Sequence, residues 1–347
     1  MSKVAVIGAG SWGTALAIVL ADNGHDVMLW ARRQEQIDEI NEKHTNQQYL
    51  PEIELPKSIV GTTDLREAVA GMEDIVLVVP TKAVRSTVQQ LRELLTTKAT
   101  IVHASKGIEP QTHKRISEMI AEEMADSNKL ADIVVLSGPS HAEEVCLRQP
   151  TTVTSSSLNI EAAKRVQDLF INQNFRVYTN PDLVGVELGG AIKNIIALTC
   201  GLTNGLGFGD NTKAAIMTRG LAEMARLGVA LGAKPLTFSG LSGLGDLIVT
   251  CTSVHSRNWR CGHMLGQGMT LDEVLEKMGM VVEGVRTTQA THELATKLNV
   301  EMPITAALFK VLFENVTPQE AAEELMGRVK KHEVEAISNY TLTDNEY

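Results

Sequence analysis

A glycine-rich turn near the start of the chain stands between a short apolar run and an amphipathic segment. The run covers residues 4–7, the turn reads GAGSWG over residues 8–13, and the amphipathic segment continues to about residue 21. Glycines in this pattern, GxGxxG, let the backbone turn tightly and approach a pyrophosphate, whose charge is stabilised by the N–H groups and dipole of the helix start. The pattern alone is weak, but this context predicts a dinucleotide-binding domain. An ordinary strand-to-helix turn is the alternative.

Short apolar runs alternate with helical segments from residue 3 to about residue 178. The runs are continuous, which is typical of strands buried on both faces of a parallel sheet. Strand and helix repeated in this way predict an α/β domain with a Rossmann-like, doubly wound sheet, which strands near residues 151–155 and 175–178 would extend. The other expected strands are residues 4–7, 27–30, 75–79, 101–103 and 133–136, and the expected helices are residues 12–21, 65–70, 84–95, 112–124 and 160–170.

The pattern of the sequence changes after Asn180-Pro181. Runs of β-branched residues become rare and apolar residues recur with helical spacing, so the second half is predicted to be all-α. We expect a dinucleotide-binding domain over residues 1–180, an all-helical substrate and catalytic domain over residues 181–335, and a polar tail over residues 336–347. The expected helices of the second domain are residues 184–202, 212–231, 271–278, 287–298, 304–313 and 318–326.

The net charge bears on which partners the protein can bind, and the cysteines and apolar runs bear on where it is located. A net charge of −10 would repel nucleic acids and anionic membrane surfaces, so neither is an expected partner. The four cysteines form no CxxC pair, no apolar run approaches the roughly 18 residues that cross a bilayer, and the first residues do not resemble a signal peptide. We therefore expect a cytoplasmic protein with reduced thiols, and a homodimer stays open.

Two arginines, Arg32 and Arg33, follow the second expected strand. In an NAD-specific domain a carboxylate about 20 residues beyond the glycines binds the ribose 2′-hydroxyl, and this sequence has none there. A guanidinium can bind a 2′-phosphate and stack on adenine, which favours NADP, or use of both NADP and NAD, over strict NAD. A solvated basic turn before the acidic segment 35–42 is the alternative.

Glycines stand beside reactive polar side chains in several later segments. SKG at residues 105–107 and SGPSHAE at residues 137–143 each follow an expected strand, which places them at the carboxyl edge of the sheet, where ligands bind in such folds. ELGGAIKN at residues 187–194 has two glycines inside a helix, each costing about 1 kcal/mol relative to alanine, which indicates a close approach of backbone or ligand. GLGD at residues 243–246 and SRN at residues 256–258 add a carboxylate and a guanidinium.

Taken together, these motifs closely resemble the bacterial NAD(P)-dependent sn-glycerol-3-phosphate dehydrogenases, over essentially the whole chain. One departure is Thr81, where many relatives have serine, and a hydroxyl is retained. The resemblance implies reversible hydride transfer between NADP or NAD and the C2 carbon of glycerol phosphate, with dihydroxyacetone phosphate as the keto partner, in support of glycerophospholipid synthesis. The motifs that carry it are GAGSWGTALA at 8–17, NQQYLP at 46–51, SKGIE at 105–109, SGPSHAEE at 137–144, ELGGAIKN at 187–194, GLGD at 243–246 and SRN at 256–258.

The resemblance also implies roles for individual residues. Lys193 matches the catalytic group that exchanges a proton with the C2 oxygen, which requires that burial or a nearby cation lower its pKa. Lys106 is expected to be that cation and to contact substrate and cofactor, whereas Asp246 orients Lys193 and opposes the lowering of its pKa. Gly190, three positions before Lys193, is expected to leave room for a small substrate. The remaining expected cofactor contacts are Gly8, Gly10, Ser11, Trp12, Gly13, Arg32, Arg33, Ala142, Arg257, Val281 and Glu283, and the expected substrate contacts are Lys106, Gly138, Ser140, Lys193, Asp246, Ser256, Arg257 and Asn258.

Four other interpretations of these residues stay open. Cysteines and histidines at positions 251, 255, 261 and 263 are zinc-ligand types, but their spacing is not the usual paired one, and no metal is expected. A hydrolase using Ser140 and His141 lacks a GxSxG motif. A 3-hydroxy-acid dehydrogenase would keep the fold and the helix lysine, and arginine binds carboxylates as well as phosphates. A cofactor-sensing module would have no need of Lys106, Lys193 and Asp246.

Overall fold

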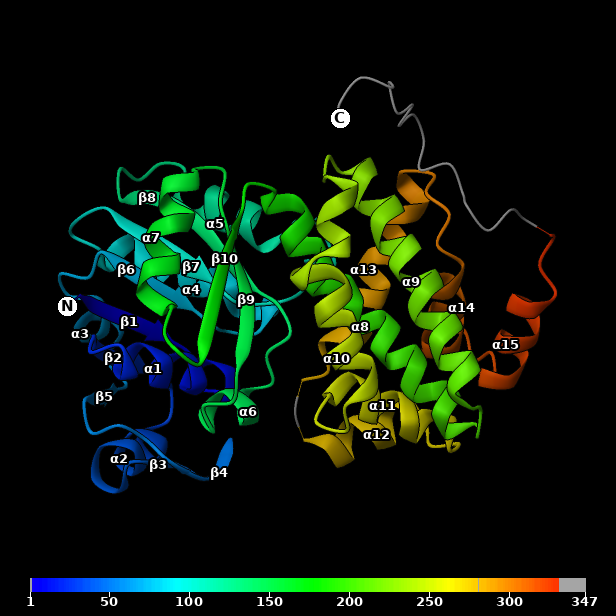
Figure 1. Ribbon diagram of the computed structural model, residues 1–347, viewed down its shortest axis with the longest axis horizontal. Helices are drawn as coiled ribbons and strands as arrows, with labels where there is room; N and C mark the ends of the chain where they lie inside the picture. The colour runs from blue at the N-terminus through cyan, green and yellow to red at the C-terminus, as the bar shows by residue number, and fades with distance from the viewer. Residues whose placement is uncertain (1, 280, 331–347) are drawn as a thin grey trace.

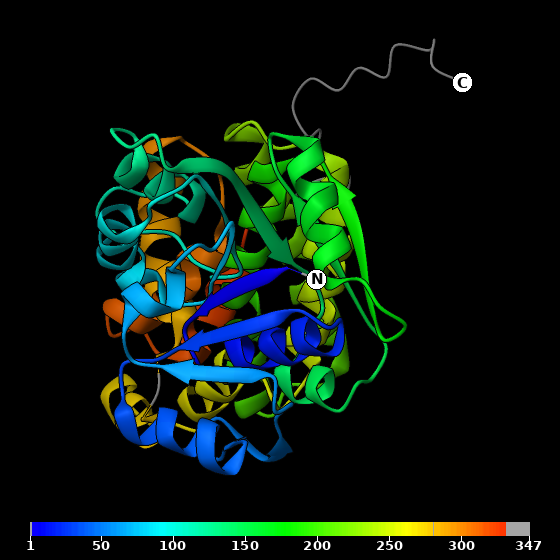
Figure 2. The same ribbon diagram turned by 90° about the vertical axis from the view of Figure 1, so that its left-hand side faces the viewer.

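The computed structural model describes residues 2–279 and 281–330 and places a sheet with flanking helices beside a bundle of helices (Figure 1). The last strand of the sheet ends at Asn180 and the first helix of the bundle begins at Leu183, next to the predicted boundary. Figure 2, viewed from the sheet side, places the bundle behind the sheet. The predicted polar tail, residues 336–347, lies outside the described residues, as do residues 331–335.

The described residues form one eight-stranded sheet in the order β10-β9-β8-β7-β6-β1-β2-β5. The chain runs outward from β1 to β2 and β5 and then returns to β6 on the other side of β1, so the strand order reverses between β1 and β6. A ligand crevice forms at such a reversal, outside the carboxyl ends of the strands. The strands are β1 (Lys3–Ile7), β2 (Asp26–Trp30), β5 (Ile59–Thr62), β6 (Asp74–Leu77), β7 (Ala99–His103), β8 (Leu130–Ser137), β9 (Thr151–Ser156) and β10 (Phe175–Asn180).

The pairing is parallel throughout the sheet except between β8 and β9, which are antiparallel. The strands expected near residues 151–155 and 175–178 therefore do extend the sheet, and the prediction of the doubly wound fold is confirmed. The edge strand β5 was not predicted. A separate short hairpin of β3 (Thr45–Asn46) and β4 (Leu50–Glu54) lies outside the sheet.

Helices cover both faces of the sheet. One buried apolar cluster joins the sheet to α1 (Ser11–Asp22), α2 (Gln34–Lys43), α6 (Ala142–Cys146) and α7 (Ile160–Phe170). A second cluster on the opposite face joins it to α3 (Leu65–Val69), α4 (Val84–Leu94) and α5 (Ile116–Met124). Burial on both faces explains the continuous apolar runs of the central strands. Helix α5 begins later than predicted, because residues before it form a loop with an antiparallel bridge between Ile108 and Arg115.

The helical half is built around α8 (Leu183–Gly205). By length and composition this helix is apolar enough to cross a membrane, although Glu187 and Lys193 interrupt it so that it contains no long continuous apolar run. It is instead a core helix, with 94% of its most apolar stretch buried. The surrounding helices are α9 (Asp210–Ala230), α10 (Asp246–Thr252), α11 (Arg257–Gly266), α12 (Leu271–Met278), α13 (Glu283–Lys297), α14 (Pro303–Phe313) and α15 (Pro318–Met326).

Helices α8 and α11 pack with their backbones in contact. Each has a pair of glycines at the crossing, Gly201 and Gly205 on α8 and Gly262 and Gly266 on α11. A Cβ atom at any of these positions would overlap a backbone atom of the other helix. Small residues permit such close approach, which here holds the first turn of α11 beside the middle of α8.

A methyl group at the helix crossing should destabilise the protein. We expect Gly262→Ala to lower the free energy of unfolding by about 1–3 kcal/mol, because the added Cβ would overlap the carbonyl oxygen of Leu198 and force the helices apart. Urea unfolding followed by circular dichroism measures this change. The control Gly209→Ser adds a side chain at the start of α9, where no atom lies within 4 Å, and should change stability little. Equal stability of both variants would contradict the packing argument.

Candidate active site

The glycine-rich turn between β1 and α1 is closely packed at two positions and open at the third. Gly8 has φ of +118°, and a Cβ there or at Gly13 would overlap a backbone carbonyl. No atom lies within 4 Å of a Cβ placed at Gly10, the N-cap of α1. The first turn of α1 has no acidic side chain, and no side chain caps it. Its N–H groups are thus left for an anion, so this turn fits the pyrophosphate of a dinucleotide.

The residues that follow the turn and the second strand border the same region. The hydroxyl of Ser11 donates to the carbonyl of Tyr49 at 3.0 Å, which ties α1 to the β3–β4 hairpin. Trp12 packs against the core of the sheet, and its buried indole N–H has no hydrogen-bond partner among the described residues. Arg33 donates to Gln36 and Gln48, and its guanidinium lies 5.9 Å from the centre of the Tyr49 ring.

Arg32 is exposed. Both arginines lie just beyond the carboxyl end of β2, and their contact with a 2′-phosphate stays a prediction.

Three charged side chains from distant parts of the chain meet at the carboxyl edge of the sheet. Lys106 comes from the loop after β7, Lys193 from the middle of α8, and Asp246 is the first residue of α10. The Asp246 carboxylate accepts a hydrogen bond from the Lys106 ammonium at 2.7 Å and a short one from Lys193. Asp246 is 1% exposed and Lys193 is 6% exposed, so the structure brings these predicted residues together in a buried cluster.

Burial is the largest influence on the Lys193 amine and lowers its pKa, which falls to about 7. The Asp246 carboxylate raises that pKa, whereas the Lys106 ammonium lowers it. Burial also raises the pKa of Asp246, but the two lysines outweigh it and hold this pKa below its usual range. Asp246 is therefore ionised at neutral pH, and Lys193 can release a proton near pH 7.

Two further side chains, Thr250 and Asn194, make hydrogen bonds at or next to Lys193 that the sequence did not predict. Thr250 accepts a hydrogen bond from the Lys193 amine at 2.8 Å. It lies four positions after Asp246 on α10, a spacing that would have indicated a shared helix face had α10 been predicted. Asn194 accepts from the side-chain amide of Asn258 at 2.9 Å, which joins α8 to α11.

The adjacent glycines Gly189 and Gly190 of α8 both lie at close approaches. A Cβ at Gly189 would lie 2.5 Å from the carbonyl oxygen of Ser242, in the turn that leads to Asp246. A Cβ at Gly190 would lie 2.8 Å from the Ser137 hydroxyl and 3.7 Å from the stem of Lys106. Ser137 and the Lys106 stem thus lie against Gly190, and the expectation that Gly190 leaves room for substrate beside Lys193 stays a prediction.

The first turn of α11 carries the expected phosphate-binding residues. Ser256 is the N-cap and accepts from the backbone of Trp259 at 3.2 Å, while the side chain of Arg257 is exposed. A helix start with an arginine favours an anion. Asn258 is buried and also accepts from the backbone N–H of Gly284 at 2.9 Å, so its amide holds α11 against α8 and α13.

The loop after β8 packs against α10. Gly138 has φ of +151° and Ser140 donates to its carbonyl oxygen at 3.0 Å. Nε2 of His141 lies 3.3 Å from the carbonyl oxygen of Val249, and Ala142 then begins α6. Because Ser140 and His141 have these separate partners, the structure does not form a hydrolase pair from them.

The Glu283 carboxylate, from the helical half, binds Thr81 in the segment that follows β6 of the sheet. Glu283, the first residue of α13, accepts from the backbone N–H of Thr81 at 3.2 Å and from its hydroxyl at 3.1 Å. Val281, two residues earlier, is partly exposed. Glu283, an expected cofactor contact, thus bridges the two halves of the chain. Its partner Thr81 is a residue that the sequence did not predict to belong to the site.

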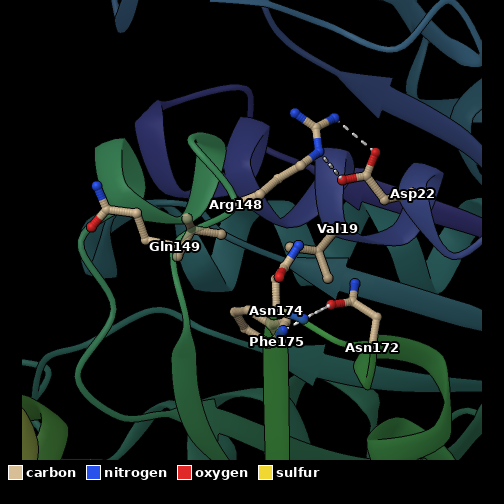
Figure 3. A pocket seen from close by; sticks show the side chains of 8 residues that line it. Val19, Asp22, Arg148, Gln149, Asn172, Asn174 and Phe175 are labelled. Carbon is tan, nitrogen blue, oxygen red and sulfur yellow. Dashed lines mark hydrogen bonds and ion pairs between the residues drawn. The ribbon is translucent and has the colours of Figure 1, made fainter.

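Two other places in the structure do not form a site. Among residues 2–279 and 281–330 no group of three His, Cys, Asp or Glu side chains could hold a metal ion, and His263 stacks on Trp259 at 5.1 Å instead. Figure 3 shows a hollow between the end of α1 and the start of β10, where Arg148 donates to both carboxylate oxygens of Asp22 at 2.9 Å. None of its lining residues belongs to the expected site.

Comparisons with known proteins show which family the chain is similar to. The sequence pattern described as the N-terminus of NAD-dependent glycerol-3-phosphate dehydrogenase matches residues 3–163, and the pattern for its C-terminus matches residues 182–323. Glycerol-3-phosphate dehydrogenase (NAD(P)+) of Shouchella clausii is 71% identical over 337 residues, covering 97% of this chain and 99% of its own. The same enzyme of Halalkalibacterium halodurans is 70% identical and covers 97% of both chains.

Solved structures show the same likeness. The crystal structure of glycerol-3-phosphate dehydrogenase from Coxiella burnetii superposes with a TM-score of 0.89 at 39% identity, covering 94% of this chain and 99% of that one. A D-mandelate dehydrogenase matches with a TM-score of 0.60 at 14% identity, which shows a shared fold alone.

The position of the two arginines predicts a change in cofactor preference. Replacing Arg32 and Arg33 together with alanine should reduce the ratio of kcat/KM for NADPH to that for NADH by about tenfold, because the 2′-phosphate would lose charge-assisted partners. Steady-state assays with both cofactors measure the ratio. Arg176→Ala is a matched control, since its guanidinium also lies over a tyrosine ring, 5.4 Å from that of Tyr178 on β10. An unchanged ratio in the double variant would refute the role of these arginines.

Proposed function

Since the chain belongs to the NAD-dependent glycerol-3-phosphate dehydrogenase family, we propose that Lys193 exchanges the proton of the substrate's C2 oxygen during hydride transfer. The activity is that of a glycerol-3-phosphate dehydrogenase (NAD(P)+), which interconverts sn-glycerol 3-phosphate and dihydroxyacetone phosphate. The observation that supports the role of Lys193 is its buried amine, held by Asp246 and Thr250 at the carboxyl edge of the sheet. A proton-exchanging group is most effective when its pKa lies near the working pH.

In the direction of oxidation, the neutral amine of Lys193 takes the proton of the C2 hydroxyl as the C2–H bond breaks. When bound, NAD(P)+ supplies the acceptor for the hydride. The electron pair of the O–H bond forms the second C–O bond of the ketone, and Lys193 becomes an ammonium. Asp246 then stabilises that ammonium, because its ionised carboxylate already accepts a hydrogen bond from Lys193. In reduction the ammonium returns the proton to the oxygen.

Lys106 and Arg257 have separate proposed tasks. The Lys106 ammonium, fixed by Asp246 at 2.7 Å, donates to the C2 oxygen and stabilises the charge that develops on it. Arg257, at the start of α11, binds the substrate phosphate together with Ser256 and the loop of Gly138 and Ser140. The resemblance of these positions to the family's substrate contacts supports this assignment.

The wider role is also a proposal. We infer that the enzyme supplies sn-glycerol 3-phosphate to glycerophospholipid synthesis in the cytoplasm, as the family does. All four cysteines are free thiols and buried, which is consistent with a reducing compartment. A homodimer is a further expectation, which the mass of the protein in solution would test.

Two substitutions separate proton transfer from substrate binding. We expect Lys193→Ala to lower kcat by roughly 10²- to 10⁴-fold while the Kd for NADPH stays nearly unchanged, because the dinucleotide is held mainly by the sheet half. Arg257→Ala should chiefly raise the KM for dihydroxyacetone phosphate, with some loss of kcat if the phosphate also positions the carbonyl. Steady-state kinetics and fluorescence titration with NADPH measure these constants. Near wild-type turnover in Lys193→Ala would remove this residue from the mechanism.

The lowered pKa of Lys193 predicts opposite pH dependences in the two directions. Oxidation requires the neutral amine, so kcat should fall as the pH drops below about 7. Reduction requires the ammonium, so kcat should fall as the pH rises above about 7. Profiles of kcat against pH in both directions, at saturating substrate, measure these limbs. A limb near pH 10, where an ordinary lysine titrates, would contradict the proposed influence of burial.

A further inference from the structure

We propose that Glu187 is a positioning residue that fixes the spacing between Lys106 and Lys193. The proposal rests on the function proposed for Lys193. Glu187 lies six residues before Lys193 on α8, and neither the sequence analysis nor the mechanism assigns it a role. Its carboxylate is buried at the junction of the two halves of the chain, where it contacts two segments of the sheet half, the end of β7 and the start of α5.

Ser117 and Arg115 donate hydrogen bonds to the Glu187 carboxylate, and the imidazole of His103 lies beside it, although neither ring nitrogen of His103 makes a hydrogen bond among the described residues. Oε1 accepts from the backbone N–H of Ser117 at 2.8 Å and lies 3.2 Å from Nε2 of His103. Oε2 accepts from the Ser117 hydroxyl at 2.6 Å and from the Arg115 guanidinium at 2.5 Å. Arg115 is itself 3.2 Å from Glu118. Such a paired, buried carboxylate holds its position firmly, because each lost partner would leave a desolvated charge.

One neighbour of Glu187, His103, lies only three positions before Lys106 in the chain. His103 is the last residue of β7, fully buried, and only Ala104 and Ser105 separate it from Lys106. Ser105 is fixed in turn, because its hydroxyl donates to the carbonyl of Val79 at 2.7 Å. The 3.2 Å approach of Glu187 to His103 therefore places α8 beside the base of the Lys106 loop, and on our proposal it fixes the distance between them.

Glu187 is also connected to Lys193 directly, because both residues lie on α8. Gly190 lies three positions after Glu187 and so shares its helix face, which is the face turned toward the sheet. A Cβ at Gly190 would lie 3.7 Å from the Lys106 stem, so that stem passes directly over the helix. Moving this face away from the sheet would move Lys193 and the Lys106 stem apart.

Glu187 acts on Lys193 through position rather than through its own charge. The charged groups that most affect the pKa of Lys193 are Asp246 and Lys106, and the Lys106 cation lowers it. His141 also faces Lys193 from the sheet side. The groups that face Glu187 are His103 from β7 and Arg115 and Ser117 from the start of α5. Loss of the Glu187 contacts would withdraw Lys106, so the pKa of Lys193 would rise.

The test is the pH profile of oxidation in Glu187→Gln, an isosteric change that removes the charge. We expect the limb to move to higher pH by about 0.5 unit or more and kcat at pH 7 to fall about twofold or more. The Kd for NADPH should change less than about twofold, because no partner of Glu187 belongs to the glycine-rich turn. Ser117→Ala is a second variant, for use if Glu187→Gln does not fold. It removes the hydroxyl that donates to Glu187 and keeps the carboxylate, so it should shift the limb less but in the same direction.

Glu223→Gln is the matched control for a purely structural effect. Glu223 is also a buried glutamate, and it accepts from the backbone N–H groups of Ile304 and Thr305 at the start of α14. Burial raises its pKa to about 7, so this control also shows whether a buried glutamate that titrates elsewhere in the chain moves the limb. The control should lose thermal stability, with its pH limb unmoved. A Glu187→Gln or Ser117→Ala limb that stays at the wild-type pH would overturn the positioning role while leaving the function of Lys193 intact. A wild-type enzyme without a limb near pH 7 would instead refute the proposed function itself.

Discussion

The structure depends on one buried carboxylate that two lysines share. Asp246 lies between Lys106 and Lys193, and all three come from segments that are far apart in the sequence. A carboxylate so deeply buried is tolerable only with cations beside it, and a buried lysine amine needs the same carboxylate. The loop after β7, the middle of α8 and the start of α10 must therefore meet at one point.

Close backbone packing makes that meeting possible. Gly189 lets the turn before Asp246 lie against α8, and the glycine pairs of α8 and α11 bring the helix that carries Arg257 to the same place. The costs of glycine in helix interiors are offset by the contacts that these approaches permit. The helical half thus presents the anion-binding start of α11 to the edge of the sheet where the strand order reverses.

The sequence predicted the sheet half well because buried parallel strands are continuous apolar runs. The position of Lys193 on a helix was also predictable, since the helical spacing of residues 184–202 is long and regular. Helices α10 and α11 were missed, because the segment around residues 240–262 contains glycines and polar residues that obscure any periodicity. The pKa of Lys193 could not be predicted either, since it depends on opposing effects of burial, Asp246 and Lys106 that only the packed structure determines.

The central claim is that burial and Lys106 bring the Lys193 amine to a pKa near neutrality despite the adjacent Asp246. The most direct measurement is a nuclear magnetic resonance titration of the Lys193 side chain, with the protein labelled with ¹³C at the lysine Cε atoms. The Lys193 signal is assigned by its disappearance in Lys193→Arg. Our account predicts a midpoint at about pH 7. A midpoint near that of an ordinary lysine, about 10.4, would contradict it.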